Sequence, residues 1–200
     1  MPWRNGRGFT LEIARAPAVG EVFAWRLSLA DIDSDGDFSP YPSYRRAIAL
    51  VAGERLDLKF RGHGTCILDP TRRGARFEGE WETHCAIPRG ICTDLSLIVY
   101  RGSGARPGSV VRAPAIVRVD ATARVFIASG LHGALFVIAG SVAVDESIRA
   151  RSRILRARDT LLLAPAGRRT LRLRSLESSA AQLIVMSWRA GRPKVTVPGR

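Results

Sequence analysis

The stretch AIALVAGERLDL, residues 47–58, combines an apolar run, an Ala-Gly pair and a segment of alternating apolar and polar residues. An apolar run of this length is consistent with a buried strand, alternation is typical of a half-buried strand, and glycine favours a turn between them. ALFVIAGSVAVD, residues 134–145, repeats the pattern. Each copy is followed by two further apolar segments around a Pro-X-Gly turn, at 88–90 and 165–167. The sequence therefore predicts that one β-unit occurs twice.

The remaining chain alternates in the same way, with turn residues between the segments. No segment shows a capped helical pattern, and LEIARA (11–16) is interpreted either as one turn of helix or as a strand. The predicted class is all-β, with one barrel or sandwich over 1–101, a Gly/Pro-rich linker at 102–109 and a second barrel or sandwich over 110–200. One elongated sandwich without a true repeat is the alternative. Strands are predicted at 22–32, 44–53, 55–60, 79–87, 93–101, 123–129, 134–140, 141–145, 160–165, 170–175 and 181–188.

The composition is that of an ordinary globular protein, with 46% hydrophobic and 24% charged residues among 200. No apolar run approaches the roughly 18 residues of a membrane helix, and glycines and Glu12 interrupt any secretory signal. We therefore expect a cytoplasmic protein with no membrane partner. Cys66, Cys85 and Cys92 are expected to be reduced, buried thiols, because no CxxC pair supports a zinc site.

The net charge of +13 comes entirely from the second half of the chain: residues 1–100 contain 13 basic and 13 acidic side chains, whereas residues 101–200 contain 18 and 5. Much of the excess lies in 147–159 and 167–175, where alternating arginines share one face of a strand. Such a stripe fits either an acidic partner such as nucleic acid or a solvated outer face. Nucleic acid is the less favoured alternative, because only His132 and Phe136 are aromatic between 127 and 187. Exposed edge strands and this basic face leave room for a homodimer.

Three ordered segments resemble the HutD/Ves family of bicupin proteins: MPWRNGRGFTLEI (1–13), FAWRLSLADIDSDGDFSPYPSYRRAIALVAG (23–53) and FEGEWETHCAIPRGICTDLSLIVYRG (77–102). The resemblance implies a bicupin, two jelly-roll-like units packed together in one chain. It also implies a link to histidine utilisation or stress response and a small ligand such as urocanate or formiminoglutamate, with no firm reaction.

The chain departs from the family pattern at several positions. Arg4 and Arg7 stand where lysine and glycine are usual, and Ser43-Tyr44 replaces a glycine-containing turn. Leu95 and Ser96 stand where phenylalanine and asparagine are usual. These changes put the ligand in doubt more than the fold.

In FAWRLSLAD (23–31), alternation places Arg26, Ser28 and Ala30 on one face of a strand. A guanidinium beside a hydroxyl and a small residue suits the inside of a barrel that binds a carboxylate. The other interpretation is a solvated face on which Arg26 is merely polar.

Arg46 precedes an apolar strand and, if buried, needs a partner, which could be Asp94, Glu12 or a ligand carboxylate. A structural salt bridge explains Arg46 equally well. Asp94 and Ser96, in the third family-like segment, are added to the predicted pocket.

The opening MPWRNGRG places Trp3, Arg4 and Asn5 together ahead of the first apolar pattern. Trp3 offers a flat wall, Arg4 a cation and Asn5 both a donor and an acceptor, which suits a binding pocket. A structural arm in which Trp3 fills a gap in the core is the alternative.

No metal or cofactor is expected, because His63, His84 and His132 are each isolated and no H-x-H pair occurs. The leading hypothesis is a metal-free pocket for a small anionic metabolite. An isomerase or hydrolase that uses Asp94 or Glu12 as acid/base is the second hypothesis, so enzyme activity is left open. Binding of nucleic acid or another acidic partner by the second half is the third.

Overall fold

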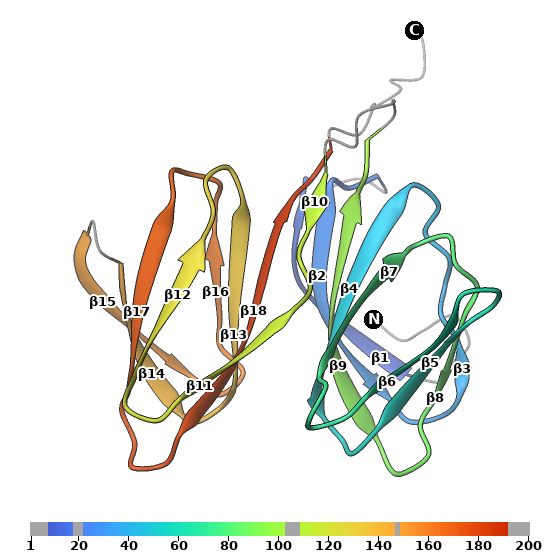
Figure 1. Ribbon diagram of the computed structural model, residues 1–200, viewed down its shortest axis with the longest axis horizontal. Coiled ribbons are helices and arrows are strands. Elements are labelled where there is room, and N and C mark those ends of the chain that lie inside the picture. The colour runs from blue at the N-terminus through green and yellow to red at the C-terminus, as the bar shows by residue number, and fades with distance from the viewer. Residues whose placement is uncertain (1–7, 18–21, 103–108, 147–148, 192–200) are drawn as a thin grey trace, which may run out of the picture. The chain divides into compact units, whose positions relative to one another are not determined.

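The computed structural model describes residues 8–17, 22–102, 109–146 and 149–191. These residues form strands and no helix, which confirms the all-β prediction (Figure 1). Nothing in these ranges forms a helix of the length and apolarity needed to cross a membrane. The chain divides into two compact units, residues 1–111 with 190–200, and residues 112–189.

The first unit contains a five-stranded and a four-stranded sheet, and each strand pair is antiparallel. The larger sheet has the order β1-β2-β9-β4-β7 and the smaller has the order β3-β8-β5-β6. LEIARA belongs to strand β1, which pairs with β2. The nine strands of these sheets are β1 (Gly8–Ala16), β2 (Trp25–Ile32), β3 (Gly36–Asp37), β4 (Tyr44–Ala52), β5 (Leu56–Phe60), β6 (Gly64–Leu68), β7 (Gly74–Glu78), β8 (Thr83–Ala86) and β9 (Cys92–Tyr100). The two-residue strand β10 (Val110–Val111) belongs to neither of them.

The second unit has the same arrangement. Strands β18, β13 and β16 are neighbours in one sheet, where β11 also pairs with β18, and the other sheet has the order β12-β17-β14-β15. Its strands are β11 (Ala115–Val119), β12 (Thr122–Ile127), β13 (His132–Ala139), β14 (Ser141–Glu146), β15 (Arg149–Arg156), β16 (Thr160–Leu163), β17 (Arg169–Ser175) and β18 (Ala181–Arg189).

Strand pairing shows that the two units repeat one topology: β2-β9-β4-β7 corresponds to β11-β18-β13-β16, and β3-β8-β5-β6 to β12-β17-β14-β15. Eight antiparallel strands in two sheets of this order form a jelly roll. The two segments that suggested a repeat are β4-turn-β5 and β13-turn-β14, and their turn glycines, Gly53 and Gly140, both have positive φ (101° and 77°). Each preceding strand also shifts register at the same place, between Leu50 and Ala52 and between Val137 and Ala139. The repeat therefore extends to this turn and this bulge. The prediction that the Pro-X-Gly turns at 88–90 and 165–167 correspond is wrong, because the first lies between β8 and β9 and the second between β16 and β17.

The core of the first unit lies between its two sheets. Residues at alternate positions of the larger sheet, such as Ile32, Ile48 and Leu50, form one buried cluster with Leu58 and Cys85 of the smaller sheet. The side-chain period of two therefore defines which face of β2, β4 and β9 points inward. The even-numbered residues of these three strands lie on that inner face.

Candidate functional site

The inner face of the first unit brings together five of the predicted site residues. Arg26 and Ser28 lie on β2, Asp94 and Ser96 on β9, and Arg46 on β4, which are neighbouring strands. Ser28 is paired in register with Ser96, whereas Arg26 and Arg46 flank Ile98 from opposite sides. All five positions are even-numbered, so their side chains share the inward face.

Four of these polar side chains are buried and Arg26 is half-buried, and four of the five have a polar atom without a partner in the part of the chain that the structure describes. Relative exposure is 2% for Ser28, 8% for Arg46, 2% for Asp94 and 6% for Ser96. Within the described residues, no hydrogen-bond partner is available to Nε of Arg46, Oδ1 of Asp94, Oγ of Ser96 or Nε of Arg26. An unsatisfied buried polar atom costs about 1–3 kcal/mol, so a cluster of four is unusual in a core that serves only packing.

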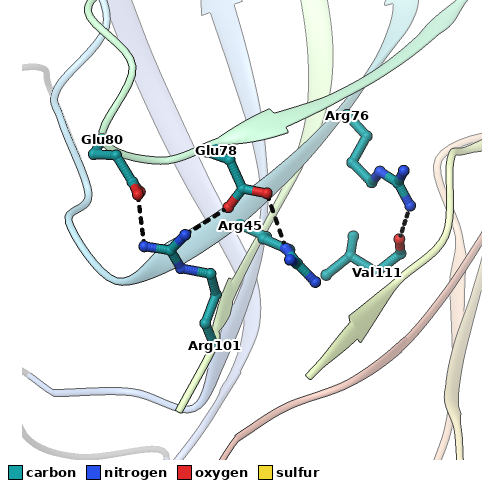
Figure 2. Close-up of polar contacts among 6 residues, drawn as sticks. All are labelled: Arg45, Arg76, Glu78, Glu80, Arg101 and Val111. Atoms are coloured by element: carbon teal, nitrogen blue, oxygen red, sulfur yellow. Dashed lines mark hydrogen bonds and ion pairs between the residues drawn. The ribbon is translucent and has the colours of Figure 1, made fainter. Parts of the chain in front are cut away.

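Two adjacent arginines on β4 differ in whether their positive charge is paired. Arg45 points to the opposite face, where its Nε contacts Oε1 of Glu78 at 3.0 Å (Figure 2). Glu78 also accepts from Arg101 at 3.0 Å, and Arg101 reaches Glu80 at 2.6 Å. Arg46, by comparison, makes one long hydrogen bond of 3.5 Å to the carbonyl of Ser39 and no ion pair with any described carboxylate. The charge of Arg45 is therefore neutralised, whereas that of Arg46 on the inner face is not.

Burial dominates the electrostatics of the cluster. Desolvation raises the pKa of Asp94 to about 7, although the nearby positive charge of Arg46 opposes that rise. Desolvation likewise lowers the pKa of Arg46 to about 10, with Asp94 acting in the opposite direction. Asp94 therefore interacts electrostatically with Arg46, but the two side chains do not form an ion pair. A proton on Asp94 is exchangeable near neutral pH, which leaves Arg46 as a buried cation able to take a ligand anion.

Aromatic rings surround the two guanidinium groups. The carbon Cζ of Arg46 lies 4.7 Å from the ring centre of Phe38 and 5.1 Å from that of Phe77. Arg26 donates a hydrogen bond of 2.9 Å to the hydroxyl of Tyr41, and its Cζ lies 5.3 Å from the ring of Phe23. Cation–π contacts and the Tyr41 hydroxyl hold both arginines in place without neutralising them.

The sequence interpretation did not include the aromatic residues of this site. Tyr41 and Phe38 come from the connection between β3 and β4, and Phe77 from the short strand β7, so alternation does not mark them. The aromatic-rich segment FSPYPSY (38–44), which lies just before Arg46, could have indicated that aromatic rings surround this arginine.

The loop that carries Tyr41 is fastened to Gly79. The amide of Tyr41 donates to the carbonyl of Gly79 at 2.7 Å, and the amide of Gly79 donates to the carbonyl of Tyr44 at 2.8 Å. Ser43 lies between them with φ of 69°, a conformation that favours glycine. A glycine at this position would adopt the same conformation without the steric cost of a Cβ atom.

The second unit lacks the polar cluster although it has the same framework. The register pairs Leu135 with Val185 and Val137 with Leu183, just as it pairs Ile48 with Ser96 and Leu50 with Asp94. Val185 and Leu183 therefore occupy the positions of Ser96 and Asp94. By the same matching, Gly133 replaces Arg46 and Ala115 replaces Ser28. The jelly roll consequently forms without these polar groups, so the cluster of the first unit is not needed to build it.

Other predicted residues lie elsewhere. Glu12 is opposite Ser28 in register, but it is exposed and contacts Arg15 at 3.4 Å. His84 contacts Asp37 at 2.7 Å on the outer face of β8, and His63 stacks on Trp81 with ring centres 4.1 Å apart. Across the described ranges, no three His, Cys, Asp or Glu side chains gather as a metal site. Trp3, Arg4 and Asn5 lie outside the described residues.

Several curated relatives match this chain. An uncharacterized 21.2 kDa protein in the hutC 3' region of Pseudomonas putida is 40% identical over 99 residues, 49% of this chain and 52% of that protein, so the match spans about half of that relative's length. Protein Ves of Citrobacter koseri is 31% identical over 148 residues, 73% of this chain and 71% of that protein.

Solved structures agree with the fold. A conserved protein of unknown function from Pseudomonas aeruginosa PAO1 has a TM-score of 0.80 and 30% identity, covering 95% of this chain and 93% of its own. HutD from Pseudomonas fluorescens SBW25 has a TM-score of 0.70 and 29% identity, with coverage of 95% and 94%. A cupin 2 conserved barrel domain protein from Leptotrichia buccalis, at 7% identity and a TM-score of 0.54, covers 92% of this chain and 88% of its own and shares the fold alone. The HutD family model matches residues 1–181, and this chain belongs to the HutD family.

Proposed function

We propose that the first jelly roll binds a small anionic metabolite on its inner face, without a metal, through Arg46, Arg26, Ser28 and Ser96. The observation that carries this proposal is the buried guanidinium of Arg46, which has no ion pair among the described residues and one hydrogen bond of 3.5 Å. A ligand carboxylate would supply the missing acceptor, and a bidentate pair with a guanidinium is the strongest form of that contact. The apolar counterpart positions in the second unit support a ligand-binding rather than a structural role.

We also propose that the ligand belongs to histidine breakdown and that binding serves a regulatory or accessory role in the cytoplasm. Membership of the HutD family and the relative encoded in a hutC 3' region support the metabolic link. Three free, buried cysteines support a reducing compartment. Urocanate and formiminoglutamate both carry a carboxylate and a nitrogen donor, and these groups match the unpaired atoms of Arg46 and Asp94.

Acid/base catalysis at the same site is the second candidate function. A carboxyl group with a pKa of about 7 beside a buried cation is suited to proton transfer near neutral pH. Asp94 would be the acid or base, and Arg26 and Arg46 would orient the substrate. Conversion of a bound ligand by the wild-type protein, and its loss in Asp94→Asn with binding retained, would establish catalysis.

A thermal-shift screen tests the binding proposal. The ligands are urocanate, formiminoglutamate, formylglutamate, glutamate and histidine, with and without EDTA. A ligand at a hundred times its Kd stabilises the native state by about 2.7 kcal/mol, which gives a measurable rise in Tm. We expect one compound to raise Tm irrespective of EDTA.

Arg46→Gln is expected to abolish that rise, whereas Arg45→Gln, on the same strand but already paired with Glu78, is expected to keep it. Equal shifts in both variants would contradict the assignment of the site. No shift with any of the compounds would contradict the link to histidine breakdown.

A further inference from the structure

We propose that the second jelly roll contains a separate binding cavity for a small monocarboxylate with an apolar body. A cavity of about 390 Å³ lies within this unit, in the range of about 300–1,000 Å³ that is usual for small-molecule sites. Val144, Leu161, Leu163 and Leu171 line it as an apolar floor, and Glu146, Arg153 and Arg169 also line it.

Comparison with the first unit shows which large side chains are replaced around this cavity. In the strand register, the Glu146–Leu171 pair of the second unit occupies the place of the Phe60–Thr83 pair of the first, so Glu146 matches Phe60. In the same way the Leu163–Gly133 pair occupies the place of the Phe77–Arg46 pair, so Leu163 matches Phe77. Trp81 and Arg169 each lie two residues before the matched position of the next strand. The first unit therefore has three aromatic residues where the second has Glu146, Leu163 and Arg169.

In the first unit those aromatic residues pack against one another. Ring centres of Phe60 and Phe77 are 4.9 Å apart, and those of Phe60 and Trp81 are 5.4 Å apart. In the second unit Arg169 contacts Glu146 at 3.1 Å, and their side chains are 20% and 24% exposed. A partly buried ion pair fills less space than three rings and leaves a polar rim around an apolar floor.

Arg153 is a positively charged residue of the cavity lining that forms no ion pair with a described residue. It lies directly across from Val144 in register and two residues before the buried Leu155, so it is on the inward face of the edge strand β15. No hydrogen bond or ion pair links Arg153 to another residue of the described ranges, and it lines the cavity. The alternating arginines of this strand were predicted to occupy one face; Arg153 faces the cavity, whereas Arg172 on β17 is exposed on the outer side.

The charge balance defines the ligand class. Among the described residues that line the cavity, Glu146 neutralises Arg169 and Arg153 keeps a positive charge, which selects a single carboxylate over a neutral or dianionic group. The leucine-rich floor selects an aliphatic or aromatic body. Arg153 could instead protect the edge strand β15 from pairing with another chain. In that case the protein would not bind such a compound, so a binding measurement distinguishes this explanation from a ligand site.

Isothermal titration of the whole chain with hexanoate, and with hexanamide as the uncharged analogue, tests the inference. We expect one hexanoate per chain in this cavity and no detectable binding of hexanamide. Arg153→Gln should raise the Kd by about tenfold or more, because a charge-assisted hydrogen bond is lost, whereas Arg172→Gln, the same change on the outer face, should leave it unchanged. Leu163→Phe, which restores the aromatic residue of the first unit, should also weaken binding.

Absence of hexanoate binding at tens of millimolar would overturn the inference, as would equal affinity for hexanamide. Loss of binding in Arg46→Gln together with retention in Arg153→Gln would place hexanoate in the first unit. That result would overturn this second site while leaving the proposed anion site intact. Because Arg153 is exposed, its substitution is not expected to disturb folding, and an unchanged Tm checks this point.

Discussion

Asp94 makes the stability of the protein depend on pH in an unusual direction. Its native pKa of about 7 lies above the unfolded value of 3.8, so the native state retains a proton that the unfolded chain loses. The stabilisation is full below pH 4 and is lost as pH rises through about 7, by up to about 1.4 kcal/mol per pH unit. This is the opposite of a salt-bridged carboxylate.

Asp94→Asn should therefore gain stability relative to wild type between pH 5 and pH 8, because the amide does not titrate. The measurement is the free energy of unfolding of both proteins in urea at several pH values, compared as a difference so that other titrating groups cancel. A difference that is constant across this range would show that Asp94 keeps an ordinary pKa.

Ser43 holds a backbone conformation that costs a side chain about 1 kcal/mol, with φ of 69°. Ser43→Gly should remove that cost and raise the free energy of unfolding by up to about 1 kcal/mol. Ser43→Ala, which keeps the Cβ atom, should give no gain. If both variants behaved alike in denaturant unfolding, the turn would not be strained as described.

At the scale of elements, the attachment of the β3–β4 loop to Gly79 positions Tyr41 over the site. A Cβ atom at position 79 would overlap the carbonyl oxygen of Tyr41 and lie 2.9 Å from that of Tyr44. Gly79→Ala should therefore displace the loop, destabilise the first unit by about 1–3 kcal/mol and weaken anion binding. Gly167→Ala is the matched control, because nothing lies within 4 Å of the added atom. Equal denaturant midpoints for the two variants would show that the loop is not held at Gly79.

Alternation predicted strands such as β5 and β17, in which every second residue is buried, whereas β4, β9 and β18 are buried on both faces and their sequences are richer in apolar residues. Alternation did not reveal β6 and β7, whose sequences GTCIL and GARFE are short and begin with glycine, or the two-residue strand β3. LEIARA was ambiguous because β1 pairs with only one neighbour and has few buried positions. In each case tertiary pairing, rather than local pattern, decides the structure.

The candidate site was predictable only in part for a related reason. Alternation put Arg26 with Ser28, and the apolar strand after Arg46 indicated that this arginine needs a partner. Asp94 and Ser96 were added from the third family-like segment, and the structure places all five on the same inner face. These residues come together through the register between β2, β9 and β4, and the sequence of a single strand does not predict that register. Tyr41, Phe38 and Phe77 were missed because a loop and a short strand carry them. The cavity of the second unit also depends on register across three strands.

For the molecule as a whole, the two jelly rolls allow a direct test of stability against function. Replacing three polar residues of the first unit with their counterparts from the second, as Ser28→Ala/Asp94→Leu/Ser96→Val, removes three buried polar side chains, two of which have an atom without a hydrogen-bond partner among the described residues. We expect the Tm of the unliganded protein at pH 8 to rise and the ligand-induced rise in Tm to disappear, because binding sites commonly reduce the stability of the native state. A fall in Tm or loss of folding would show instead that the polar cluster supports the core.

The strand order also has a consequence for biosynthesis. In each jelly roll the last strand, β9 or β18, inserts between two strands that are made much earlier, β2 and β4 or β11 and β13. A nascent chain therefore cannot complete either large sheet until that strand has left the ribosome, and two unpaired edges stay open meanwhile. Such late, long-range closure gives a high contact order, slow folding and a period of exposure to aggregation. Each half of this protein depends on its final strand to end that period.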